Sequence, residues 1–187
     1  MFYTRKGDDG TTKFFDSRPG ERGSKRSLRA EALGACDEIN SLLGLIKVKA
    51  GEAELTIQSK NWHAENILEF AQQGLFIVQA ELAGAEKPFP EDKVRHMEAV
   101  VDAMESEMPE IKSFFVSGGT ELGALFDFAR TVARRTERRV VAALDAGEVT
   151  IEPAARQFIN RLSSILYAFA RYANFRAGVT ERSPTYE

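Results

Sequence analysis

The sequence contains little cysteine and histidine, and it has no long apolar run. Cys36 is the only cysteine of 187 residues, which excludes an intrachain disulfide and leaves no set of thiolates for a metal. His63 and His96 fit no ligand spacing, so they are expected at the surface and no metal site is predicted. No stretch approaches the ~18 apolar residues of a membrane span, and the N-terminus lacks the apolar core of a signal peptide. These absences predict a cytoplasmic protein with no membrane partner.

The charge of the chain is small but unevenly distributed. The net charge is −3, which argues against a globally basic nucleic-acid binder. Residues 1–31 carry eight Lys/Arg against five Asp/Glu, a balance of +3, so the remainder sums to −6. Positive charge is therefore concentrated in the N-terminal segment and in the run 130–139. If these two regions meet in space, they form a local anion site on an acidic protein.

Most of the chain follows the 3.6-residue period of amphipathic helices. Residues 1–26 are irregular, and the last residues, 179–187, are expected to form a mobile tail. The bundle between them, 27–178, is predicted to contain five helices, at about 28–49, 61–83, 91–108, 121–145 and 153–176. Gly51 is expected to stop the first helix, and only 112–116 resembles a strand. The fold class is therefore all-α, a single domain (1–187) built as a five-helix antiparallel bundle.

Five arginines fall within ten residues of the fourth predicted helix. Arg130, Arg134 and Arg138 are spaced i, i+4, i+8 and share one face, and Arg135 and Arg139 form a second row. Like charges at this spacing repel, and guanidinium forks suit carboxylates and phosphates. A phosphate-bearing ligand is one interpretation. A solvated basic face with local carboxylate partners is the other.

Two glycine-containing segments could also bind an anion. Residues 3–12 combine two glycines three apart with basic and hydroxyl side chains, although the segment is not a Walker A loop and could be only a flexible arm. Residues 117–120, Ser-Gly-Gly-Thr, precede the arginine helix, where backbone N–H groups and the helix dipole favour negative charge. The alternative is a plain loop with Thr120 as the N-cap.

Several single residues stand out against their surroundings. Asp37 lies beside apolar neighbours and needs a cationic partner if it is buried, for which an arginine of the fourth helix is the obvious candidate. Asn160 interrupts the fifth helix, where it either holds the helix register or contacts a ligand. Phe114 and Phe115 either cap the core or line an apolar pocket. Cys36 is expected to be a small buried hydrophobe.

Four motifs occur together in the order seen in a known family. They are Y-T-R-K-G-D-D-G-T-T, A-L-G-A-C-D-E-I-N-S-L-L-G, S-G-G-T-E-L-G-A-L-F-D-F-A-R-T-V-A-R-R-T-E-R-R and F-I-N-R-L-S-S-I-L-Y-A-F-A-R-Y-A-N. On these residues the chain resembles the PduO-type ATP:cob(I)alamin adenosyltransferases over nearly its whole length.

The resemblance implies a ferritin-like five-helix bundle that assembles as a homotrimer with its sites at the subunit interfaces. It also implies a reaction in which the adenosyl group of ATP moves to the cobalt of a corrinoid (cobalamin) and triphosphate leaves. Mg²⁺ would neutralise the phosphates, and a corrinoid reductase would supply electrons. The cobalt(I) nucleophile belongs to the corrinoid, so the absence of an activated Ser, Cys or His is consistent with this chemistry.

The resemblance also assigns roles to residues of this sequence. Arg134 corresponds to a catalytic phosphate contact, and Asp37 and Arg130 correspond to a pair that bridges two subunits. Phe114 corresponds to the cobalamin-binding aromatic that displaces the lower axial ligand of cobalt, leaving a four-coordinate form that can be reduced. The residues expected to bind ATP are Thr4, Arg5, Lys6, Gly7, Thr12, Lys13, Lys25, Arg134, Arg135, Glu137, Arg138 and Asn160.

Three functions remain to be distinguished. The first is the adenosyltransferase itself. The second is a non-catalytic ATP- and cobalamin-binding trimer that acts as a cofactor chaperone or sensor. The third is a small helical nucleic-acid binder that uses the arginine face, which the acidic total charge disfavours.

Overall fold

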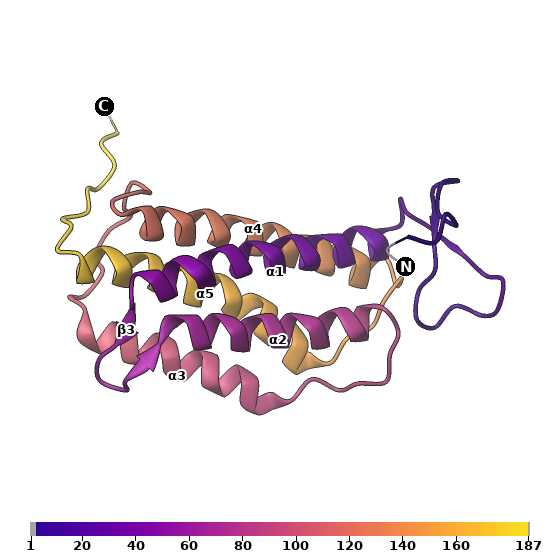
Figure 1. Ribbon diagram of the computed structural model, residues 1–187, viewed down its shortest axis with the longest axis horizontal. Helices are drawn as coiled ribbons and strands as arrows, with labels where there is room; N and C mark the ends of the chain where they lie inside the picture. The colour runs from indigo at the N-terminus through magenta and orange to yellow at the C-terminus, as the bar shows by residue number, and fades with distance from the viewer. Residues whose placement is uncertain (1–2, 187) are drawn as a thin grey trace.

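The structure is a computed structural model that describes residues 3–186. Five helices make up most of it, and consecutive helices run in opposite directions, as Figure 1 shows. This confirms the predicted five-helix antiparallel bundle. The helices are α1 Leu28–Glu52, α2 Ala64–Leu82, α3 Glu91–Glu107, α4 Glu121–Asp145 and α5 Pro153–Arg176. Within residues 3–186, no helix is long and apolar enough to cross a membrane.

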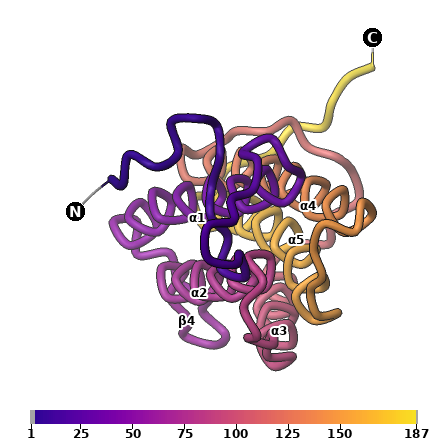
Figure 2. Tube along the Cα trace, turned by 90° about the vertical axis from the view of Figure 1, so that its right-hand side faces the viewer, coloured from indigo at the N-terminus to yellow at the C-terminus, as the bar shows by residue number. Residues whose placement is uncertain are grey.

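The helices pack in a fixed order around one core. α4 lies between α1 and α5, α1 also contacts α2, and α5 also contacts α3, as the end view in Figure 2 illustrates. α5 is the central helix, because more than half of its 24 residues are buried. Phe126 of α4 stacks on Phe169 of α5 with ring centroids 4.9 Å apart. Gly74 lets α2 approach α5 closely, since a Cβ at this position would overlap the ring of Phe158.

Two of the helix boundaries differ from the predicted ones. α1 continues through Gly51 to Glu52, and the chain turns only at Glu54, whose φ is +46°. A single glycine in a last turn lowers helix stability without ending the helix. α2 begins at Ala64 rather than near Asn61, because the two residues before Ala64 belong to a short strand.

Four two-residue strands form two small hairpins. Thr11–Thr12 (β1) pairs with Gly23–Ser24 (β2), and Thr56–Ile57 (β3) pairs with Trp62–His63 (β4), both antiparallel. The prediction of a strand at 112–116 is wrong, because these residues form irregular chain. Strands of two residues carry no readable alternation, which is why the sequence does not reveal them.

A polar cluster attaches the β3–β4 hairpin to the bundle. The hydroxyl of Tyr172 donates to the Thr56 carbonyl oxygen at 3.0 Å and also contacts the carboxylate of Glu107. Glu107 accepts the backbone N–H of Ser59 at 2.7 Å and that of Gln58 at 3.3 Å. Partial burial acts to raise the pKa of Glu107, but these hydrogen bonds outweigh it and lower the pKa to about 2.

Candidate functional site

The five arginines of α4 divide into two rows that face different neighbours. Arg135 Nη2 lies 2.6 Å from Glu38 Oε1, and Arg139 Nη2 lies 2.7 Å from Glu31 Oε1. Both glutamates belong to α1, so this row packs across the α1–α4 seam. For Arg139 the interpretation as a basic face with local carboxylate partners is therefore correct.

Two arginines of the other row have no charged partner among the described residues. Arg134 and Arg138 are exposed, and neither forms an ion pair or a side-chain hydrogen bond with any residue in 3–186. Arg130 is half-buried, and its guanidinium lies 5.9 Å from the centre of the Tyr167 ring on α5. Cationic side chains without partners beside a cleft favour an anionic ligand.

A large cleft opens beside this row. It has a volume of about 1000 Å³ and lies between α3, α4, α5, the loop before α4 and the C-terminal segment. Arg130 and Arg134 line it from α4, and Tyr167 lines it from α5. Phe114 also lines it with 79% of its surface exposed, so this aromatic faces the cleft and does not cap the core.

A smaller groove of about 260 Å³ follows the same two helices further along α4. Glu137 and Asn160 lie in it, and the Asn160 amide donates to Glu137 Oε1 at 2.7 Å. Glu137 is three residues from Arg134, and residues at that spacing are neighbours on a helix surface. The α4–α5 face therefore carries three of the predicted ligand residues, which are Arg134, Glu137 and Asn160.

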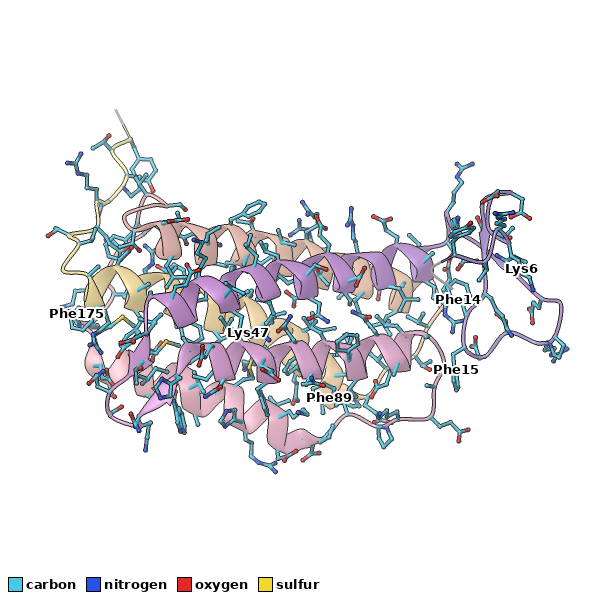
Figure 3. The ribbon with its side chains drawn as sticks, in the orientation of Figure 1. Lys6, Phe14, Phe15, Lys47, Phe89 and Phe175 are labelled. Carbon is cyan, nitrogen blue, oxygen red and sulfur yellow. The ribbon has the colours of Figure 1, made fainter. Side chains whose placement is uncertain are left out.

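Residues 3–26 fold into a ribbon that lies beyond the N-terminal end of α1. Lys25 Nζ donates to the Gly7 carbonyl oxygen at 2.7 Å, which joins two predicted ATP-binding residues. Thr12, Lys13 and Lys25 line one hollow of about 310 Å³. Thr4, Arg5 and Lys6 are exposed on the ribbon, and Figure 3 shows Lys6 well away from the helices.

The ribbon and the cleft lie at opposite ends of the bundle. The ribbon lies beside the N-terminal end of α1, whereas the C-terminal segment that borders the cleft leaves the other end of the bundle, as Figures 1 and 3 show. Within residues 3–186, no hydrogen bond or ion pair joins 3–26 to 130–139. Within one chain the ribbon is therefore not bonded to the arginine run, and the contact between the two charged regions is that of Arg139 with Glu31 at the start of α1.

Asp37 does not pair with an arginine of its own chain. It is exposed on α1 and forms no ion pair with any of the described residues. Arg130 instead lies near Asp127 of its own helix, with Nε 3.7 Å from Oδ1. The sequence predicted a cationic partner for Asp37 only if Asp37 is buried. In one chain it is exposed, so it needs no such partner there.

The sequence reasoning missed a buried ionic pair next to the cleft. Arg171 Nη2 lies 2.5 Å from Asp127 Oδ2, and the exposed fractions of the two side chains are 3% and 5%. The signal was present, since each residue is a charge within an apolar helix stretch. Removing one partner of a buried pair costs about 3–5 kcal/mol because the remaining charge stays buried.

The loop before α4 is held by Asn174, which was also missed. The Asn174 side-chain oxygen accepts the backbone N–H of Thr120 at 2.9 Å, and Thr120 Oγ1 caps the helix by accepting from Gly123 N at 2.9 Å. Gly118 and Gly119 have φ values of +133° and +96°, which suit glycine. Thr120 is confirmed as the N-cap, and side-chain oxygens accept the backbone N–H groups of Thr120 and Gly123.

Cysteine and histidine have structural positions. Cys36 has no exposed surface, and burial raises the pKa of its thiol to about 12, so it is the expected small hydrophobe. His96 is half-buried rather than at the surface, with its ring centroid 4.5 Å from Phe70 and 5.4 Å from Trp62. Residues 3–186 contain no group of three or more His, Cys, Asp or Glu placed to hold a metal.

Comparison with known proteins decides the family. The sequence profile of the cobalamin adenosyltransferase family matches residues 2–173. The chain belongs to this family. A corrinoid adenosyltransferase from Bacillus subtilis is 36% identical over 181 residues, which cover 95% of this chain and 88% of that protein.

Other members are also similar in sequence and structure. The corrinoid adenosyltransferase PduO of Citrobacter freundii is 39% identical over 176 residues, which cover 90% of this chain and 48% of that protein, so the chain spans about half the length of this relative. A variant of a PduO-type ATP:corrinoid adenosyltransferase from Lactobacillus reuteri, complexed with cobalamin and ATP, superposes with a TM-score of 0.85. It is 30% identical, and the match covers 100% of this chain and 97% of that one.

Proposed function

We propose that this member of the family transfers the 5′-deoxyadenosyl group of ATP to the cobalt(I) of a corrinoid such as cobalamin. A cobalt–carbon bond forms at C5′, the C5′–oxygen bond breaks, and triphosphate leaves with the electron pair. The observation that carries the proposal is the cleft that brings Arg134 and exposed Phe114 to one face of the bundle. The similarity to a structure complexed with cobalamin and ATP supports it.

The α4 arginines fit the leaving group. Triphosphate concentrates negative charge, and cationic donors already in place stabilise that charge without reorganisation. We assign Arg134 the catalytic phosphate contact and Arg138 a binding contact, since neither has another partner within residues 3–186. Arg135 must give up its ion pair with Glu38 to reach a phosphate, so we expect it to contribute least of the three arginines to ATP binding. The remaining proposed ATP contacts are Thr4, Arg5, Lys6, Gly7, Thr12, Lys13, Lys25, Glu137 and Asn160.

The cleft fits the corrinoid. Aromatic and aliphatic side chains make up about half of its lining and polar or charged groups the rest, so it offers both apolar surface and polar contacts. Phe114 presents most of its ring to this space, and we assign it the displacement of the lower axial ligand of cobalt. The cobalt supplies the nucleophile, so the protein's task is to position the two substrates.

We further propose that the protein acts as a homotrimer. The ribbon and the cleft of one chain lie apart, so a site that uses both needs a second copy. Leu45 and Val48 on α1 and Phe128 on α4 are more than half exposed, and exposed apolar groups on neighbouring helices favour an interface. In such an interface Asp37 can pair with Arg130 of a neighbouring copy.

Mg²⁺ belongs to the nucleotide in this proposal. No cluster of carboxylate, imidazole or thiolate groups among residues 3–186 is built to hold a metal, which fits an ion carried by the phosphates. The proposal includes a cytoplasmic location and a corrinoid reductase as electron donor. The alternative is a non-catalytic ATP- and cobalamin-binding trimer.

A single-turnover experiment tests the proposal. The protein is mixed with ATP, Mg²⁺ and chemically reduced cob(I)alamin, and the visible spectrum of the cobalt–carbon bond is followed together with released triphosphate. We expect equimolar adenosylcobalamin and triphosphate. Tight ATP binding without either product would support the chaperone or sensor instead. Mass measurement in solution tests the trimer independently.

A further inference from the structure

The C-terminal segment, residues 179–186, has one carboxylate that reaches into the bundle. Glu181 Oε1 accepts from Arg171 Nη1 at 2.6 Å and from Asn174 Nδ2 at 2.6 Å. Both donors lie on α5 and have exposed fractions of 2% and 0%. A segment expected from the sequence to be a mobile tail therefore has a charged anchor in the core of the fold.

The same anchor holds the loop that carries Phe114. Asn174 donates to the Gly118 carbonyl oxygen at 2.8 Å with the same nitrogen that contacts Glu181. Further along, Val116 N donates to the Arg182 carbonyl oxygen at 2.9 Å. The loop and the C-terminal segment are thus attached to one another as well as to α5.

The buried charges around Arg171 require their partners to be well placed. Arg171 is shared between Asp127 and Glu181, whose side chains are 5% and 14% exposed, so the guanidinium serves two carboxylates in a mostly dry site. A buried charge is tolerated only where its partners are well placed. Phe115 lies against the same guanidinium, with its ring centre 5.6 Å away. Phe115, the residue next to Phe114, therefore packs on the same guanidinium that binds the two carboxylates.

We infer that Glu181 is a positioning residue for the corrinoid step. Through Arg171 and Asn174 it holds the 113–118 loop so that Phe114 stays directed into the cleft. This rests on the proposed function, and specifically on the displacement of the lower axial ligand by Phe114. Glu181 contacts neither substrate in this assignment, and its effect passes through the loop.

The test compares two corrinoids in Glu181→Gln, which keeps the size of the side chain and removes its charge. We expect turnover with cob(II)alamin and a reduced flavin donor to fall about 10- to 100-fold, as misplacement of a positioning group does. Cobinamide lacks the lower base that Phe114 must displace, so its turnover should stay within about 3-fold of wild type. The four-coordinate cob(II)alamin signal, read by electron paramagnetic resonance with ATP bound, should shrink in parallel.

Arg182→Gln is the matched control, because it changes one charge on the same segment and leaves the backbone bond to Val116 in place. It should behave as wild type with both corrinoids. Equal losses with cobalamin and cobinamide in Glu181→Gln would overturn the inference and indicate a general structural role, as would an unchanged four-coordinate signal. If wild type itself adenosylates neither corrinoid, the proposed function fails, and that outcome is separate from these.

Discussion

The two rows of arginines on α4 have the same chemistry and different neighbours. Arg135 and Arg139 face α1 and are engaged by glutamates of that helix. Arg134 lines the cleft, Arg138 is exposed, and neither has such a partner within residues 3–186. Consecutive residues of a helix are rotated by about 100°, so Arg134 and Arg135 point to different sides of α4. Position around the helix, and not residue type, therefore divides structural from ligand-facing charge.

The largest expected effect is at Arg134. In Arg134→Ala we expect single-turnover adenosylation with cob(I)alamin to fall at least about 100-fold, because a preorganised donor to the leaving triphosphate is lost. The melting temperature should stay within a few degrees, since the side chain has no ion pair or hydrogen bond among residues 3–186 to lose. Arg139→Ala is the matched control on the other row, and it should retain near-normal turnover. Normal turnover in Arg134→Ala would show that this row is not the phosphate site.

Glu107 offers the opposite pattern, a charge with a structural role and no contact with the cleft-facing arginines. In Glu107→Gln we expect unfolding free energy to fall by about 1–3 kcal/mol, because backbone and hydroxyl donors lose a charged acceptor. Chemical denaturation at pH 7 measures this, and ATP affinity should not change.

The same residue predicts a pH dependence. Its pKa of about 2 in the folded protein lies below the ordinary value of 4.5, so its stabilisation is complete above pH 4.5 and is lost as pH falls toward 2. Wild type should therefore lose stability between pH 4.5 and 2 more steeply than Glu107→Gln, as followed by thermal melts. Glu110→Gln, on an exposed loop, should show the wild-type slope. Identical slopes for all three proteins would contradict the assignment.

A smaller effect is expected at Arg138. In Arg138→Ala the dissociation constant of ATP should rise about 10-fold, the equivalent of ~1.4 kcal/mol for one charge-assisted contact. Isothermal titration in the presence of Mg²⁺ measures it. The loss should diminish at high salt, because the contact is exposed. A salt-independent loss would indicate a structural defect instead.

The smallest effect is expected at Arg135. In Arg135→Ala unfolding free energy should change by less than about 1 kcal/mol, as for other partly exposed ion pairs. ATP affinity should change by less than about 3-fold. A double-mutant cycle with Glu38→Ala measures the pair itself. If Arg135→Ala weakens ATP binding as much as Arg138→Ala, the division of the two rows is incorrect.

The sequence predicted the helices well and their junctions poorly. Apolar periodicity located all five helices, and Pro153 correctly marked the start of α5. The β3–β4 hairpin was absorbed into the predicted start of α2, because two-residue strands leave no pattern. Gly51 was taken as a stop although α1 continues past it. Such ends depend on tertiary contacts, such as those of Tyr172 with the hairpin.

The bundle, the family and the residue types that could bind an anion can be predicted from the sequence, because they follow from periodicity and from motifs within single segments. Helix packing sets which arginines have carboxylate partners within residues 3–186, and it lets Asn174, Arg171 and Glu181 join the loop before α4 to the C-terminal segment. These outcomes depend on the faces that neighbouring helices cover. They also depend on contacts between residues more than 50 positions apart, such as Asn174 with Gly118. No local pattern in the chain encodes such pairings.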